Sequence, residues 1–240
     1  MPWWGRSRAL GVQTPALVAF DDSRDIVPVP FAVYHRVRCG MPLERFVRRP
    51  VLARDAWTDV GRELARVHAV SPGSDVPVRL REFRQSPEVD PRPWVGELRA
   101  HGALTGPDAE FLHTLLDRLA TAALADVPLR LCHGDLNATN ILVAGESRRF
   151  LALIDWAGAG GLDPVWDFAA VPLNMVPFLL DGHRSVAPLP LDRTAEARIA
   201  WCKMQMRLLA ARRMIGDESI GTKLRRDVDH IRTFVAAELA

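Results

Sequence analysis

The chain has 240 residues, of which 48% are apolar and 25% are charged, proportions typical of a soluble globular protein that can bury a substantial core. Its formal net charge is +2, because nearly as many residues are acidic as basic. The basic residues are also spread along the chain among the acidic ones. This balance argues against nucleic acid or a membrane surface as a partner.

The first predicted element is a hairpin. Ala16–Phe20 and Pro30–Val37 contain strand-forming residues, and the polar residues between them favour a turn. Arg38–Pro42 holds a glycine and a proline and is expected to be a linker. From Arg54 the apolar residues recur with a helical period, and we expect His68, at the end of this face, to pack in the core.

The next predicted element is a connection followed by two helices. Ser71–Pro93 is rich in proline and charge and predicts an irregular segment, and a short helix is expected within Pro93–Ala103. Thr105 and Asp108 form a capping-box pattern at the start of the second helix. The apolar stripe of that helix consists of Phe111, Leu112, Leu115, Leu116 and Leu119.

Three apolar segments that follow are too short for helices and predict buried strands: Leu129–Cys132, Ile141–Val143 and Phe150–Ile154. If the last two pair antiparallel, Asn140 and Asp155 lie toward the same end of their hairpin. The proline-rich segment Pro172–Leu191 is expected to be a loop on the substrate side. Two amphipathic helices complete the chain, one carrying Trp201, Met204, Leu208, Ala211 and Ile215 and the other covering Asp227–Leu239.

The cysteines and the apolar segments indicate the cellular compartment in which the protein is expected. Cys39, Cys132 and Cys202 are odd in number and show no metal-ligand spacing, so we expect buried thiols in a reducing environment. The longest apolar run is interrupted by proline and asparagine and is too short to span a bilayer. The first residues have no signal-peptide pattern. These features together predict a cytoplasmic protein.

The most informative residues border the three short strands. His133-Gly134-Asp135 follows the first strand, Asn140 precedes the second, and Asp155 follows the third. Phosphoryl transfer needs a carboxylate that accepts the proton of the attacking hydroxyl, and oxygen ligands that hold Mg²⁺ against the phosphates. Asp135 can be the base, and Asn140 and Asp155 can be the ligands.

These segments resemble the aminoglycoside phosphotransferase family, whose relatives include choline, homoserine and macrolide kinases of protein-kinase-like fold. The residues that carry the resemblance are 133–143 (HGDLNATNILV), 154–160 (IDWAGAG) and 162–169 (LDPVWDFA), with weaker likeness at 64–68 and 34–42. The family usually has glycine where this chain has Leu162.

The resemblance implies an α+β, protein-kinase-like fold with a mostly helical C-terminal lobe and short β-hairpins. It implies that Asp135 is the catalytic base and that Asn140 and Asp155 bind Mg²⁺. His133 is expected to support the catalytic loop structurally, and Asp167 to brace the same loop through backbone hydrogen bonds. The expected reaction moves the γ-phosphoryl group of ATP, or of another nucleoside triphosphate, to a hydroxyl of a small molecule, for which an aminoglycoside-type antibiotic is one candidate.

Two parts of the family pattern are missing. No lysine precedes Lys203, and only Gly5 and Gly11 precede Gly40, so the sequence has neither the glycine-rich loop over the phosphates nor the strand lysine. We therefore expect an N-terminally truncated member, with residues 1–40 a remnant of the small lobe and residues 41–240 the helical lobe. The residues that bind the nucleotide stay unassigned. Gly158, Gly160 and Gly161 lack the order of a phosphate-binding motif and predict a flexible loop.

The missing parts leave alternatives open. Because phosphoryl transfer depends on positioning and charge neutralisation, the chain could be a pseudokinase or remnant that acts as a binding module. The incomplete lobe could then pair with another chain, including a second copy. The start codon could also be assigned too late, or the gene degraded. A metal-dependent hydrolase that uses His133, Asp135 and Asp155 is a further alternative, although it lacks the histidine-rich ligand sets usual for zinc.

Overall fold

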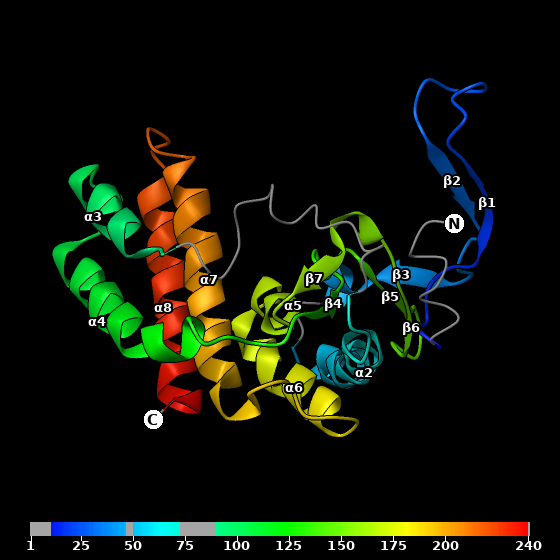
Figure 1. The fold of residues 1–240 in the computed structure, drawn as a ribbon. Helices are drawn as coiled ribbons and strands as arrows, with labels where there is room; N and C mark the ends of the chain where they lie inside the picture. Colours follow the sequence, from blue (N-terminus) through cyan, green and yellow to red (C-terminus); the bar gives the residue numbers. More distant parts are fainter. Residues whose placement is uncertain (1–10, 47–49, 73–89, 240) are drawn as a thin grey trace.

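The computed structural model describes residues 11–46, 50–72 and 90–239 (Figure 1). Strands in this part of the chain are β1 (Leu17–Asp21), β2 (Phe31–Tyr34), β3 (Gly40–Pro42), β4 (Arg130–Cys132), β5 (Ile141–Ala144), β6 (Phe150–Leu153) and β7 (Gly160–Leu162). Helices are α2 (Pro50–His68), α3 (Arg92–Ala100), α4 (Gly106–Ala123), α5 (Val165–Ala170), α6 (Val176–Arg184), α7 (Ala195–Arg212) and α8 (Ile220–Glu238). Within these ranges, no helix is long and apolar enough to cross a membrane.

The strands form three small antiparallel sheets. The predicted hairpin is confirmed as β1–β2, and the predicted pairing of the two strands around residues 144–149 is confirmed as β5–β6. β3 adds to β5 on the other side, and β4 pairs with β7. Two expectations are therefore wrong: Gly40–Pro42 is a strand rather than part of a linker, and Gly160–Leu162 is a strand rather than a flexible loop. Glycine and proline do not favour strands. Both segments are strands nevertheless, because a neighbouring strand supplies the hydrogen bonds that hold them extended.

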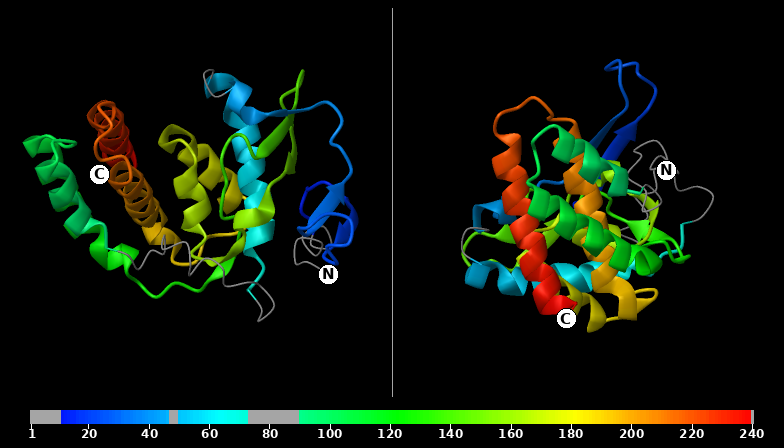
Figure 2. Two further views of the ribbon diagram at one scale, coloured as in Figure 1. Left: turned by 90° about the horizontal axis from the view of Figure 1, so that it is seen from above. Right: turned by 90° about the vertical axis from the view of Figure 1, so that its left-hand side faces the viewer.

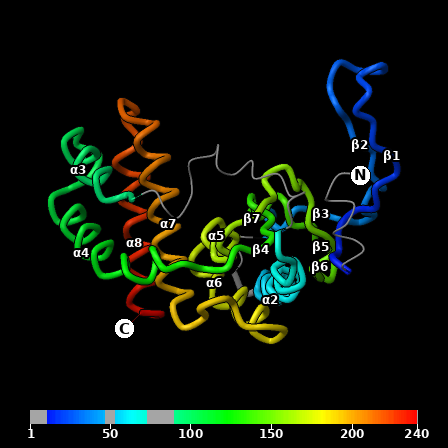
Figure 3. The backbone as a smooth tube through the Cα atoms, viewed as in Figure 1, coloured from blue at the N-terminus to red at the C-terminus, as the bar shows by residue number. Residues whose placement is uncertain are grey.

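The elements lie in successive layers across the molecule. Figure 2 shows α3 and α4 at one side, then α7 and α8, then α5 and α6, then α2 with the sheet β3–β5–β6, and finally the β1–β2 hairpin. The backbone trace in Figure 3 follows the same order. This arrangement is the predicted mixture of a mostly helical body and short hairpins. The predicted division at residues 40 and 41 stays a prediction, and residues 73–89 of the predicted irregular connection lie outside the described part.

The helical half largely follows the sequence pattern. The predicted faces of α2 and α4 are buried, apart from the half-buried Phe111 of α4, and Thr105 caps α4 by accepting a hydrogen bond from the backbone N–H of Asp108. α8 begins at Ile220 rather than Asp227, which lengthens the predicted helix at its N-terminal end. α7 carries the predicted apolar residues, except that it ends before Ile215. It is not amphipathic, because it also buries Arg198, Lys203 and Gln205. Neighbours on several sides, among them α3, α4, α5 and α8, surround this helix and bury its polar positions as well.

Two further expectations need correction. The predicted substrate-side loop, Pro172–Leu191, contains α6, whose residues Leu179 and Leu180 are buried in the core. Prolines at 172, 177, 188 and 190 signalled a loop, but Pro177 lies in the first turn of α6, where proline is tolerated. Cys132 and Cys202 are buried thiols as predicted, whereas Cys39 is exposed.

Close packing of α2 against α6 brings together two buried histidines, His68 of α2 and His183 of α6. A Cβ atom on Gly61 would lie 2.1 Å from the carbonyl oxygen of Leu179, and one on Gly182 would lie 2.0 Å from that of Thr58. Real Cβ atoms do not approach backbone oxygens this closely, so only glycine at both positions lets the two helices cross at this separation.

We expect Gly182→Ala to destabilise the protein by at least 1–3 kcal/mol, roughly the cost of overpacking a core. The added Cβ would collide with backbone rather than with a flexible side chain, so the two helices must separate. Gly96→Ala is the matched control, because a Cβ on this α3 residue meets nothing within 4 Å. That control should be neutral or stabilising by about 0.5–1 kcal/mol, since alanine favours a helix over glycine. Urea unfolding of both variants measures the difference, and equal stabilities would contradict the close crossing.

Candidate functional site

The catalytic-loop candidates lie between two sheets. The segment from His133 to Asn140 leaves β4 and enters β5, so it connects the β4–β7 pair to the β3–β5–β6 sheet. Asp135 is exposed near the middle of this loop, and Asn140 is buried at its end. Asp155 is exposed immediately after Ile154, just beyond β6. Because β5 and β6 are antiparallel neighbours, the end of the loop and the start of the Asp155 turn are adjacent.

Direct hydrogen bonds bring the predicted base and one predicted metal ligand together. Nδ2 of Asn140 donates to the carbonyl oxygen of Asp135 at 2.9 Å and to its Oδ2 at 3.1 Å. Nδ2 of Asn137 donates to the other carboxylate oxygen at 3.1 Å. The Asp135 carboxylate is therefore oriented by two side-chain amides. Asn137 had no predicted role, because its only signal in the sequence was its place within the motif.

Asp155 is linked to the same group through the backbone. The N–H of Ile154 donates to the carbonyl oxygen of Asn140 at 2.9 Å, which places Asp155 one residue beyond this contact. Asp155 adopts a left-handed backbone conformation with φ of 61°, and a short 3-10 turn (Trp156–Gly158) follows it. Such a conformation is uncommon outside glycine, and it lies where the extended segment that contains β6 gives way to this turn.

Gly134 is required by the conformation of the loop. Its φ is +80°, and a Cβ at this position would lie 1.9 Å from the carbonyl oxygen of Gly158. The backbones of Gly134 and Gly158 are therefore in contact, and they join the loop to the turn after Asp155. Asp135, the third residue of the loop motif, is the next residue along the chain after Gly134.

Asp167 lies beneath the loop and holds its backbone. Its Oδ2 accepts a hydrogen bond from the N–H of His133 at 2.8 Å, and its Oδ1 accepts one from the N–H of Gly134 at 2.8 Å. Its Oδ2 is also 3.1 Å from Nε2 of His68. Burial by itself would raise the pKa of the Asp167 carboxyl, but the hydrogen bonds that it accepts from His68 and from the N–H of Gly134 contribute to lowering that pKa below the ordinary value. Asp167 is therefore an ionised, fully buried carboxylate.

His133 connects the loop to the residue before Asp155. Its Nε2 is 2.9 Å from the carbonyl oxygen of Ile154, and its ring packs against Trp156 with the ring centroids 4.6 Å apart. Burial lowers the pKa of His133, so the neutral ring donates Nε2–H to this carbonyl. His133 thus contacts the residue that precedes the second predicted metal ligand, Asp155.

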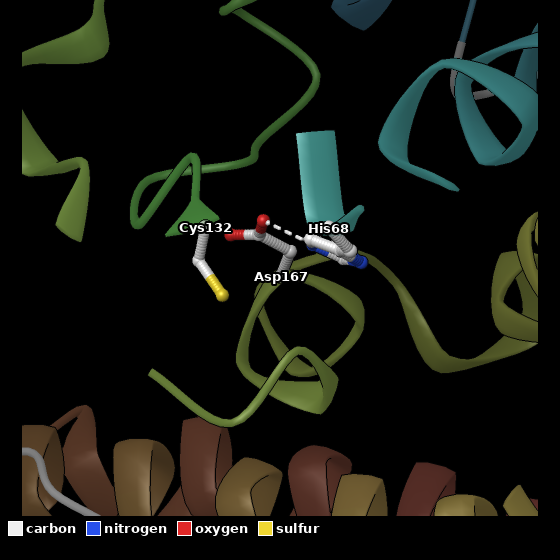
Figure 4. A group of neighbouring side chains, drawn as sticks. All are labelled: His68, Cys132 and Asp167. Atoms are coloured by element: carbon white, nitrogen blue, oxygen red, sulfur yellow. Dashed lines mark hydrogen bonds and ion pairs between the residues drawn. The ribbon is translucent and has the colours of Figure 1, made fainter. Parts of the chain in front are cut away.

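One group in the described part of the chain has the spacing of a metal site. Ligand atoms of His68, Cys132 and Asp167 all lie within 4.8 Å of one another. Figure 4 shows the Cys132 side chain turned away from the hydrogen bond between the other two. Both Asp167 oxygens already accept backbone hydrogen bonds, and burial raises the pKa of the Cys132 thiol well above its usual value. A metal needs a thiolate and free carboxylate oxygens. We therefore interpret this group as a hydrogen-bonded support of the loop and not as a metal site. His68 is buried as predicted, but its polar partners were not anticipated.

A cavity of about 510 Å³ opens beside Asp155. Its wall is formed by residues from four stretches of the chain: Thr14, Pro15, Tyr34, His35, Arg36, Val37, Leu142, Ile154, Asp155, Trp156 and Ala157. Nε1 of Trp156 donates to Oγ1 of Thr14 at 3.0 Å and ties the N-terminal segment to this wall. These lining residues could not be found from the sequence, because no motif connects segments so far apart.

Comparisons of sequence place the chain among known enzymes. The phosphotransferase enzyme family matches residues 5–199. No curated protein matches the chain in sequence.

Solved structures show the same fold at low sequence identity. A choline/ethanolamine kinase family protein from Mesorhizobium loti is 17% identical with a TM-score of 0.65, and the match covers 96% of this chain and 77% of that one. The GDP complex of wild-type aminoglycoside 2'-phosphotransferase-IIIa is 17% identical with a TM-score of 0.61, covering 97% and 83%. The GDP and kanamycin complex of APH(2")-IIIa is 16% identical with a TM-score of 0.59, covering 99% and 85%. The family model matches most of this chain, and the solved structures share its fold. The chain therefore belongs to the phosphotransferase enzyme family.

Proposed function

We propose that this chain transfers the γ-phosphoryl group of ATP, or of another nucleoside triphosphate, to a hydroxyl of a small molecule. One observation carries the proposal: a continuous set of contacts runs from the cavity to the candidate base. Asp155 lines the cavity, its neighbour Ile154 is hydrogen-bonded to Asn140, and Asn140 donates to Asp135. The nucleotide-binding cavity, the metal ligands and the base would therefore be neighbours, as in-line transfer requires.

The donor atoms at Asn140 and Asp155 fit Mg²⁺. Nδ2 of Asn140 is committed to Asp135, which leaves Oδ1 as the atom available to a cation, and Asp155 adds a carboxylate. Amide and carboxylate oxygens are the protein ligands that this ion prefers. When bound there, Mg²⁺ would neutralise charge on the phosphates. The relatives solved with GDP support the use of a nucleotide at this fold.

Asp135 would accept the proton of the substrate hydroxyl. The hydroxyl oxygen forms a bond to the γ-phosphorus, the bond from that phosphorus to the bridging oxygen breaks, and the nucleoside diphosphate leaves. To do this, Asp135 must come within roughly 2.6–3.2 Å of the hydroxyl oxygen, and its exposure leaves that approach open. The relative solved with kanamycin favours a polyhydroxylated, amine-bearing substrate such as an aminoglycoside.

A second candidate function is nucleotide binding without catalysis, and the lysines favour it. Nζ of Lys203 is buried and donates to the carbonyl oxygens of Ala169 and Val171, and Lys223 forms an ion pair with Asp217. Neither lysine lines the cavity, where the cationic side chain is that of Arg36. A binding module of this kind could also self-associate, as the sequence predicts. Activity under saturating nucleotide and acceptor distinguishes the two functions.

Binding of Mg·ATP is expected to raise the thermal stability of the chain. At a ligand concentration of about 100 times the dissociation constant, the gain is roughly 2.7 kcal/mol. For a chain of this size that gain corresponds to roughly 5–11 °C in Tm. Asp155→Asn should lose the part of the shift that depends on Mg²⁺, and ATP with EDTA should show the same loss in the unaltered chain. No shift with Mg·ATP would contradict both candidate functions.

A further inference from the structure

A chain of hydrogen bonds runs from a surface loop to the base of the catalytic loop. Nδ1 of His183 is 2.8 Å from the carbonyl oxygen of Ala187, and Nε2 of His183 is 3.1 Å from Nδ1 of His68. Nε2 of His68 is in turn 3.1 Å from Oδ2 of Asp167. The three side chains come from α6, α2 and α5, and each is at most 4% exposed. The close glycine contacts between α2 and α6 allow the two rings to meet.

The acceptors at the two ends determine where the protons lie. A backbone carbonyl can only accept, so the short contact with Ala187 requires a proton on Nδ1 of His183. Burial lowers the pKa of His183 to about 4, so this ring is neutral near pH 7 and its Nε2 carries no proton. Nε2 of His183 must therefore accept, and the donor 3.1 Å away is Nδ1–H of His68.

The other end places a second proton on His68. Asp167 is ionised and can only accept, so Nε2 of His68 must donate to it. Three donor–acceptor contacts need three protons, whereas two neutral imidazole rings supply two. The reverse arrangement would set the lone pair of His183 Nδ1 against the carbonyl oxygen of Ala187 at 2.8 Å, leaving both buried groups unsatisfied.

We propose that His68, held between Asp167 and His183, donates from both ring nitrogens as a buried imidazolium, and that His183 is thereby a positioning residue for the loop that carries Asp135. The positive ring neutralises the buried carboxylate that accepts the N–H groups of His133 and Gly134. Hydrogen bonds to an ionised acceptor are roughly twice as strong as neutral ones, so the charge state of this carboxylate governs how firmly the loop is held. The part of the inference that concerns catalysis rests on the proposed function; the charge state of His68 does not.

Other charged and titratable groups near the two rings already have partners among the described residues. Arg184 and Asp192 act on His183 from a distance and bond to each other, with Nε of Arg184 3.1 Å from Oδ2 of Asp192. Arg130, which lines a cavity of about 410 Å³ beside both rings, donates to Ser71. Cys132 and His133, on the far side of Asp167, are neutral, because burial raises the pKa of the thiol and lowers that of the ring.

Nitrogen-15 NMR of the histidine rings tests the charge state directly and needs no substrate. At about pH 8, above the ordinary histidine pKa of roughly 6.5, both nitrogens of His68 should carry protons, while His183 should be neutral with its proton on Nδ1. Spectra of His68→Gln and His183→Gln assign the signals. A neutral His68 at this pH in the unaltered chain would overturn the proposal, whether or not the chain is a kinase.

A matched pair of substitutions tests the positioning role. His183→Gln keeps an acceptor for Nδ1 of His68, whereas His183→Leu has a similar size and removes it. In His183→Leu we expect His68 to become neutral and kcat to fall roughly 10- to 100-fold, the scale of a small misplacement of catalytic groups, with KM for Mg·ATP unchanged. His183→Gln should keep a charged His68 and most of kcat. Equal kcat values for the two variants would refute the positioning role. If the leucine variant fails to fold, the ring charges in the unaltered chain and in His183→Gln still decide the charge state.

Discussion

Asp135→Asn is expected to lower turnover by roughly 10²–10⁴-fold, the usual contribution of a general base. The substitution keeps the size of the side chain, and the hydrogen bond from Asn140 Nδ2 to the carbonyl oxygen of residue 135 does not depend on the side chain. Loop geometry should therefore survive, while the group that accepts the proton of the hydroxyl is lost. The measurement is phosphoryl transfer from Mg·ATP to kanamycin, the acceptor bound by the APH(2")-IIIa relative.

A control separates the loss of a base from the loss of a surface charge. Asp126→Asn makes the same chemical change at an exposed position outside the site and should leave turnover unaltered. The Tm shift with Mg·ATP should persist in Asp135→Asn, because the proposed metal ligands Asn140 and Asp155 are intact. If the two variants turn over equally fast, Asp135 is not the base. If neither they nor the unaltered chain transfer phosphate to kanamycin while the Tm shift is present, the chain binds nucleotide and kanamycin is not its acceptor.

Asp167→Ala is expected to cost about 3–5 kcal/mol in the free energy of unfolding, the scale for removing one partner of a buried ion pair. The side chain is fully buried, and its loss leaves two buried N–H groups of the catalytic loop without an acceptor. It also leaves the His68 ring without its counter-charge. Urea unfolding near pH 7 measures this cost.

Two comparisons make this prediction specific. Asp167→Asn keeps one oxygen acceptor and should lose less stability than Asp167→Ala. Asp229→Ala, on the exposed side of α8, should change stability by no more than about 0.5 kcal/mol. A cost below about 1 kcal/mol for Asp167→Ala would mean that this carboxylate does not support the loop.

The cost should also depend on pH in a defined direction. The folded-state pKa of Asp167 is lower than its unfolded value of roughly 3.9, so its contribution is fully present above that unfolded value. It disappears as pH falls through the lower folded-state pKa. The contribution of the Asp167 carboxyl's own titration to the difference between the unaltered chain and Asp167→Ala should therefore stay constant near neutral pH and shrink only in strong acid.

Local patterns in the sequence predicted several elements correctly. The buried face of α2, the cap of α4 and the β5–β6 pairing each depend on residues close together in the chain. The motif around Asp135 was informative for the same reason, because its glycine, its aspartate and the asparagine five residues later must lie on one tight loop. A helical period, a cap and a short loop are local features, and local features can be read without a structure.

Contacts between distant segments decided the rest. Gly40–Pro42 and Gly160–Leu162 are strands only because β5 and β4 lie beside them, and α6 forms despite prolines because its apolar side packs against α2. The wall of the cavity beside Asp155 comes from four stretches of the chain. His68 and His183 are 115 positions apart, and no spacing rule joins them. The sequence by itself determined the family and predicted the chemistry of the loop, because both depend on short motifs. Only the tertiary structure decided how that loop is braced and what the cavity is made of, because buried hydrogen bonds and close helix crossings are properties of packing.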